Sequence, residues 1–126
     1  MQYMTHRAKL LIGTIVAMVL VVSGTFYLEP QVAKPGERMF ALEIRDHSLA
    51  QGPAVMPVNQ GDTVKLHVKS DQATRLMVHG YEKELAVSGG GEADLAFVAD
   101  KSGRYPLHLH EGNNHIEVAA LEVQPR

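Results

Sequence analysis

The feature that most constrains the fold of this chain is a two-residue alternation of apolar and polar side chains, which recurs after residue 37. It is sharpest in residues 103–110, GRYPLHLH. Successive side chains of a strand point to opposite faces of a sheet, so Leu107 and Leu109 can enter a core while His108 and His110 share the other face. The alternation therefore predicts a strand that presents two histidines roughly 7 Å apart.

The same pattern recurs in short segments that are separated by turn residues such as those of Asn59–Asp62 and Ser88–Gly91. No helix is expected after residue 28. Seven or eight short strands with closely spaced turns predict an all-β sandwich or barrel. The strands are expected at residues 39–47, 55–58, 63–69, 75–81, 84–87, 93–98, 105–110 and 116–123. The expected core comprises Val64, Leu66, Val68, Phe97, Tyr105, Leu107 and Leu109.

An uncharged apolar run occupies residues 10–28 and follows a short basic segment. The run is long enough to span a bilayer as a helix, and the basic flank predicts that the rest of the chain is exported. A cleaved signal peptide is the alternative, because small residues suited to cleavage follow Val22. Residues 1–28 are therefore expected to be a membrane anchor or signal peptide, residues 29–37 a linker, and residues 38–126 the folded domain.

This organisation predicts a single-pass protein of the cell inner membrane whose domain lies on the periplasmic, extracytoplasmic side. If the N-terminus is cleaved, the domain is a secreted periplasmic protein instead. The membrane is then a partner through the N-terminal helix, and a periplasmic or membrane protein is a second possible partner.

Composition excludes several classes of function. The chain has no cysteine, which excludes disulfides, thiolate metal sites and cysteine nucleophiles. A formal charge of −2 gives no reason to expect nucleic acid as a partner. The glycines at 89–91 lack the spacing and the lysine of a phosphate-binding loop, and no serine has the context of a nucleophile elbow. We therefore do not expect an enzyme.

Three segments resemble the cupredoxin-like domains, most closely the small bacterial periplasmic ones. Residues 57–71, PVNQGDTVKLHVKSD, are similar to a cupredoxin strand pair joined by a Gly-Asp turn. Residues 95–110, LAFVADKSGRYPLHLH, resemble the strand, turn and Tyr-bearing strand that lead into the copper loop. Residues 76–87, LMVHGYEKELAV, are similar to the segment that carries the first copper histidine. The resemblance covers about residues 38–124 and implies a Greek-key β-sandwich.

The resemblance also implies a copper site of two histidines, a cysteine and a weak methionine ligand, and here the chain departs from it. The position of the copper cysteine falls near Leu109, and that of the first histidine falls on Met77, with His79 two residues further on. Without a thiolate there is no blue copper centre, so electron transfer by the usual route of the family is not expected.

The candidate metal ligands are His79, His108, His110, His115 and Met77, with Glu111 as a further possible ligand. Imidazole and thioether groups suit copper, whereas imidazole with carboxylate suits zinc or copper(II). The alternative is that these histidines are merely solvated on an exposed strand face. His67, between two lysines, is expected to be solvated, and His47 to be a turn residue.

Two functions follow from these residues. The first is an exported, membrane-tethered domain that binds or buffers a metal ion through histidines, and copper is the ion that we expect. The second is a metal-free β-sandwich that docks on a membrane or periplasmic partner and has no cofactor. Convergence of the histidines in space distinguishes the two.

Overall fold

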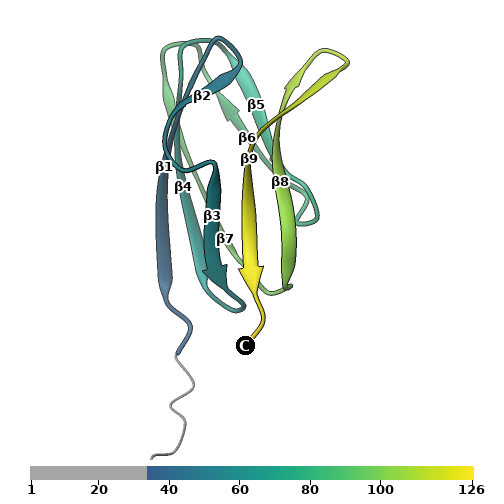
Figure 1. Cartoon of the computed structure of the whole chain (residues 1–126). Coiled ribbons are helices and arrows are strands. Elements are labelled where there is room, and N and C mark those ends of the chain that lie inside the picture. Colours follow the sequence, from purple (N-terminus) through teal and green to yellow (C-terminus); the bar gives the residue numbers. More distant parts are fainter. Residues whose placement is uncertain (1–33) are drawn as a thin grey trace, which may run out of the picture. The chain divides into compact units, whose positions relative to one another are not determined.

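The computed structural model describes residues 34–126 (Figure 1). The expected N-terminal helix at residues 1–28 and most of the expected linker lie outside this part. The described residues contain no helix, and therefore none that could cross a membrane. They form nine strands: β1 (Glu37–Arg45), β2 (Ser48–Gln51), β3 (Val55–Asn59), β4 (Thr63–Ser70), β5 (Thr74–Val78), β6 (Lys83–Val87), β7 (Glu92–Val98), β8 (Gly103–Glu111) and β9 (Asn114–Gln124).

The strands form two sheets that pack face to face, as the sequence predicts. One sheet has four strands in the order β2-β1-β4-β7, and the other has five in the order β3-β9-β8-β5-β6. β1 pairs with β4 and β3 pairs with β9 in parallel, while the other pairs are antiparallel. Consecutive strands thus often belong to different sheets, which confirms the expected Greek-key β-sandwich.

The core lies between the two sheets and is built by the expected alternation. Leu66 of β4 and Leu107 and Leu109 of β8 are fully buried. Of the seven residues expected in the core, six are buried; Tyr105 is only half-buried. The reason is its hydroxyl group, which reaches the surface and donates a hydrogen bond to the carbonyl of Ser102 (2.8 Å). The opposite face of β8 is left for the histidines.

β5 is shorter than the sequence predicts. The alternation favoured a strand through Tyr81, but β5 ends at Val78 and a turn follows. Gly80 (φ 87°) and Glu82 (φ 51°) adopt left-handed backbone conformations, which end the strand. The prediction of a strand that extends to residue 81 was therefore wrong. The ring of Tyr81 instead packs against aromatic residues at the edge of the core.

An irregularity in the pairing of β8 with β9 decides which residues of β9 share a face with the histidines. Leu107 pairs with Ala119, but His108 pairs with Glu117, so Val118 has no partner on β8. This extra residue is a β-bulge, and it reverses the side-chain alternation of β9 relative to β8. As a result, His115 and Glu117 face the same side as the histidines of β8.

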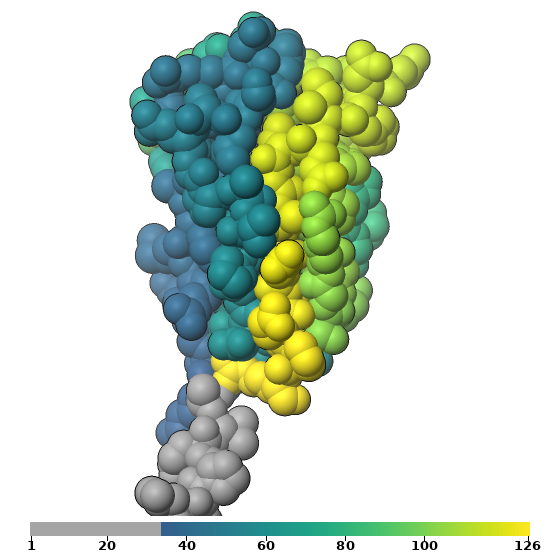
Figure 2. All heavy atoms as spheres, in the orientation of Figure 1, coloured from purple at the N-terminus to yellow at the C-terminus, as the bar shows by residue number. Residues whose placement is uncertain are grey.

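The end of the sandwich where the described chain begins is held together by the buried carboxylate of Asp62, which is 1% exposed. The backbone N–H groups of Gly36 and Asn59 donate to it, each over 2.9 Å. The Arg126 guanidinium donates to it over 2.7 Å, and Arg38 lies 3.6 Å away. The hairpin of β8 and β9 projects from the opposite end, as Figure 2 shows.

Candidate metal centre

Five candidate ligands gather on the outer face of the five-stranded sheet. The strand register places Met77 of β5 directly opposite His108 of β8, and His110 of β8 directly opposite His115 of β9. Directly opposed residues of antiparallel strands have Cβ atoms about 4.5–5.5 Å apart on one face. His79 follows the end of β5, and its backbone N–H still donates to a carbonyl of β8 (3.1 Å), which keeps it beside that strand.

Three of the histidines converge closely enough to hold one ion. A ring nitrogen from each of His79, His110 and His115 lies within 4.8 Å of the other two, and we call these residues the histidine trio. The ring centroids of His110 and His115 are 4.3 Å apart, and that of His79 lies 6.1 Å and 6.5 Å from them. His108 lies edge-on against His79 at 4.4 Å but is not one of the three.

Three ring nitrogens of this cluster are buried and have no hydrogen-bond partner among residues 34–126. They are Nε2 of His79, Nδ1 of His108 and Nε2 of His110. A buried polar atom without a partner costs about 1–3 kcal/mol in desolvation. A cation that accepts the lone pairs of neutral imidazoles would remove that cost. The residues present therefore fit a metal that favours imidazole ligands, such as copper or zinc.

The environment of His108 favours the uncharged ring that such a metal needs. Burial lowers the pKa of His108 below its usual range, and the neighbouring ring of His79 lowers it further. The carboxylate of Glu117 acts in the opposite direction but does not outweigh burial. His108 is therefore largely neutral near pH 7, and a neutral ring nitrogen is the form that coordinates a metal.

The carboxylates beside the cluster are engaged in contacts of their own. Glu117, opposite His108 on β9, accepts a hydrogen bond from Arg104 (2.5 Å). Glu84, opposite Met77 on β6, lies 3.3 Å from Arg75. Among the described residues of the cluster, the donors outside these ion pairs are imidazole nitrogens and a thioether sulfur, a set that suits copper better than a hard cation.

Two of the sequence expectations for this region need correction. The expected strands at residues 105–110 and 116–123 left His115 in the loop between them, but it lies in β9, because that strand begins at Asn114. Glu111 was considered as a helper, but its carboxylate accepts a hydrogen bond from the Thr74 hydroxyl (2.8 Å) and lies 3.3 Å from Nδ1 of His47. Its carboxylate therefore ties the hairpin to the β1–β2 turn instead of joining the trio.

His67 lies apart from the cluster, on the outer face of the four-stranded sheet, but it is not simply solvated. Its Nδ1 lies 2.7 Å from Asp94 and its Nε2 3.2 Å from Glu92. The hydrogen bond to Asp94 and the charges of both carboxylates raise the pKa of His67 above its usual value. The expectation of a solvated residue was thus incomplete, because it overlooked the acidic side chains on β7.

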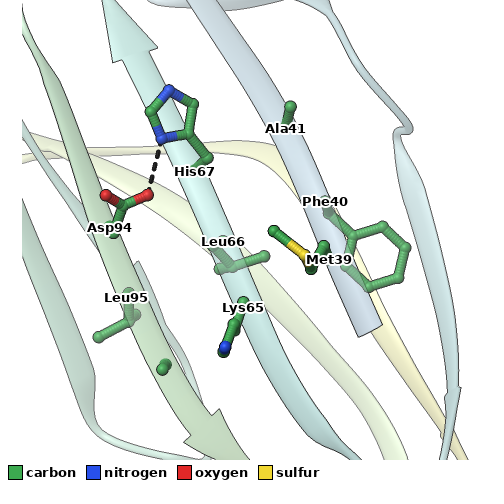
Figure 3. Close-up of a pocket in the computed structure, with 9 residues that line it drawn as sticks. Met39, Phe40, Ala41, Lys65, Leu66, His67, Asp94 and Leu95 are labelled. Carbon is green, nitrogen blue, oxygen red and sulfur yellow. Dashed lines mark hydrogen bonds and ion pairs between the residues drawn. The ribbon is translucent and has the colours of Figure 1, made fainter. Parts of the chain in front are cut away.

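Beside His67 is a shallow hollow of about 510 Å³ that crosses β1, β4 and β7 (Figure 3). Met39, Ala41 and Leu95 supply its apolar lining, and Lys65 and Asp94 supply charges. Met39 is 73% exposed. The sequence did not single out this surface, because its residues come from three strands that the chain order keeps apart.

Comparison with known proteins supports the fold. The chain matches no protein-family model and no curated protein. Among solved structures, it is similar to a chain of a heme-copper terminal oxidase dimer, at 13% identity and a TM-score of 0.60, with 94% of this chain and 95% of that chain covered. It is also similar to a copper binding protein solved in the apo form, at 10% identity and a TM-score of 0.56, with 73% and 92% covered.

A multi-copper oxidase from Pseudomonas Thermotolerans is a third similar structure, at 18% identity and a TM-score of 0.58. The match covers 74% of this chain and 31% of the oxidase, so the chain spans about a third of that protein's length. Likenesses at such low identity establish a fold and not an activity. The domain is a cupredoxin-like β-sandwich, as the resemblance implied.

Proposed function

We propose that this protein is a cupredoxin-like metal-binding module that holds a copper ion on the histidine trio and buffers it or hands it to a partner. The observation that carries this proposal is the convergence of three ring nitrogens, from His79, His110 and His115, within 4.8 Å. A bound ion would meet only nitrogen donors in the trio. The protein would act by binding and not by catalysis.

The chemistry of the cluster supports copper as the ion. Imidazole is a ligand for copper and zinc alike, but copper binds more tightly than zinc to a given nitrogen site. Several solved structures with the same fold are described as copper proteins. Because cysteine is absent, the module is proposed as a store or carrier of copper and not as a blue-copper electron carrier.

The apolar run at residues 10–28 supports a cellular setting for this module. A helix there would tether the domain to the inner membrane, with the domain on the periplasmic side. A cleaved signal peptide would release the same domain into the periplasm. In either case, the proposed partner in copper transfer is a periplasmic or membrane protein.

Calorimetric titration of the full-length protein with copper(II) tests the proposal. Wild-type protein is expected to bind, and the double variant His110→Ala/His115→Ala to lose affinity by about a hundredfold or more, because two of three ligands are removed. His67→Ala is the matched control, since this histidine lies on the other sheet, and its affinity is expected to equal that of wild type.

Two outcomes would contradict the proposal in different ways. Equal affinity in wild type and the double variant would show that copper binds elsewhere. No binding in either protein would favour the alternative function, a metal-free module that docks on a partner. Zinc titration in parallel measures the preference between the two metals.

A further inference from the structure

Two donors of the cluster are left over after the histidine trio is assigned, and they lie side by side. His108 is opposite Met77 in the register of β8 and β5, so their side chains share the outer face at the distance of direct cross-strand neighbours. Nδ1 of His108 is buried and has no hydrogen-bond partner in the part of the chain that the structure describes. We call these two residues the Met77–His108 pair.

This pair differs from the trio in chemical character. The thioether of methionine is a soft ligand that favours copper(I), whereas an all-imidazole set also suits copper(II) and zinc. In the described part of the chain, the carboxylates directly opposite these two residues are those of Glu84 and Glu117, and each forms an ion pair with an arginine. These two carboxylates are therefore already paired with cations.

The pair and the trio are connected through one ring. His79 lies 4.4 Å from the ring of His108 and also contributes a nitrogen to the trio. This ring, just beyond the end of β5, is therefore next to both sets of donors. One surface thus offers two overlapping groups of ligands, one of nitrogen alone and one of nitrogen with sulfur.

We propose that the cluster binds copper in two positions according to its oxidation state, with copper(II) on the histidine trio and copper(I) on the Met77–His108 pair with His79 shared between them. This inference rests on the proposed metal-binding function and deepens it. Each ion is taken up in the state in which it is supplied, so no electron transfer by the chain is involved. A carrier of this kind would accept copper from donors in either state.

The test measures both oxidation states on the same variants of the full-length protein. Copper(I) affinity is measured without oxygen by competition with a copper(I) chelator, and copper(II) affinity by calorimetry. Met77→Leu is expected to weaken copper(I) binding by about tenfold or more while leaving copper(II) affinity unchanged, because only a soft donor is lost. Leucine has a similar volume, so the fold should be retained, and a thermal melt checks this.

Two comparisons make the result specific. Met39→Leu, at an exposed methionine of the other sheet, should leave both affinities unchanged. His110→Ala/His115→Ala should lose copper(II) and retain copper(I). X-ray absorption of the copper(I) form should show a sulfur neighbour in wild type and none in Met77→Leu.

Different results would contradict the two-position inference and the proposed copper(II) site on the histidine trio. Wild-type copper(I) affinity in Met77→Leu, or no sulfur neighbour in the wild-type protein, would overturn the two-position inference even if the trio binds copper(II). Loss of copper(I) together with copper(II) in the His110/His115 double variant would also overturn it. If the wild-type protein binds no copper(II), and copper(I) binding is lost only in Met77→Leu, the result would overturn copper(II) binding by the trio and support copper(I) binding by the pair.

Discussion

His110 and His115 face each other across the β8–β9 hairpin with their ring centroids 4.3 Å apart, although four residues separate them in the chain. The hairpin thus supplies two of the three residues of the histidine trio by itself. His79, from the end of β5, completes the trio from the other side of β8.

The optical spectrum of the copper-loaded protein tests the ligand set. Copper(II) on imidazoles alone is expected to show only weak ligand-field absorption. The intense thiolate-to-copper band should be absent, because the chain has no cysteine. Absorption spectra across a copper(II) titration check this, with the tyrosine band as an internal measure of concentration. An intense visible band would mean that the bound copper has a ligand other than those assigned here.

Leu107 lies in the core directly behind the histidines, and its replacement tests the assignment of the faces of β8. Leu107→Ala is expected to lower the free energy of unfolding by about 2–5 kcal/mol, from lost transfer energy and the cavity left behind. Val98→Ala, at a residue 52% exposed on β7, should change it by less than about 0.5 kcal/mol. Denaturant unfolding measures both, and equal effects would show that the faces are assigned wrongly.

The buried carboxylate of Asp62 predicts a specific sensitivity to acid. Hydrogen bonds from Gly36 and Asn59 and the nearby guanidinium groups of Arg126 and Arg38 lower its pKa in the folded state, outweighing burial. Folding thus favours the ionised form of Asp62. The stability that this group contributes is fully present above the pKa of the unfolded state, about 3.9, and is lost as the pH falls through the lower pKa of the folded state.

Asp62→Ala is therefore expected to reduce the unfolding free energy by about 3–5 kcal/mol near pH 7, because Arg126 loses its buried partner. The gap between this variant and wild type should narrow as the pH falls below about 4. Unfolding curves over a pH series measure the gap. The exposed Asp100→Asn serves as control and should follow wild type at every pH. A gap that is constant with pH would contradict the assigned ionisation.

Nuclear magnetic resonance titration of the metal-free protein should show that the pKa values of His67 and His108 are shifted in opposite directions. His67 is expected to titrate above 6.5, because Asp94 and Glu92 stabilise its protonated ring, and His108 below 6.5, because it is buried beside His79. The stability that His67 contributes to the fold is accordingly present below the pKa of this residue in the unfolded chain. It is lost as the pH rises through the higher pKa of the folded state. Asp94→Asn should move the pKa of His67 back toward 6.5 and leave His108 unchanged.

Gly80 tests how closely the turn after β5 controls His79. Its φ is 87°, and a Cβ at this position would lie within 2.3 Å of the Tyr105 ring. Gly80→Ala is expected to cost about 1–3 kcal/mol of stability through overpacking and to weaken copper binding, because the turn that positions His79 must shift.

Gly90→Ala is the matched control for this substitution. Gly90 also has a positive φ, 72°, but a Cβ there would meet no atom of the described residues within 4 Å. The control therefore has the backbone strain, about 1–2 kcal/mol, without the clash, and its copper affinity should equal that of wild type. Calorimetry and thermal melts on both variants measure the difference, and equal copper affinities in the two variants would show that the turn does not position the site.

Much of the fold follows from local patterns in the sequence. The alternation in residues 63–69 and 105–110 depends only on the geometry of a strand, so it identified β4, β8 and their buried faces before any partner strand was known. The end of β5 was missed because residues 75–81 can be read as one alternating strand, with Met77, His79 and Tyr81 on the face opposite the apolar one. A left-handed turn at Gly80 and Glu82 interrupts the strand there. The short strand β2 was missed because four residues carry too little pattern.

The sequence by itself determined that one face of β8 would be apolar and the other would carry His108 and His110, since side-chain alternation is a property of a single strand. It also determined, by the absence of cysteine, that no thiolate could bind a metal. Only the tertiary structure decided which other side chains meet these histidines. Strand register and the bulge at Val118 place His115 opposite His110, and the turn at Gly80 places His79 beside them. Pairing between strands distant in sequence depends on backbone hydrogen bonds and packing of the whole sandwich, which no local pattern specifies.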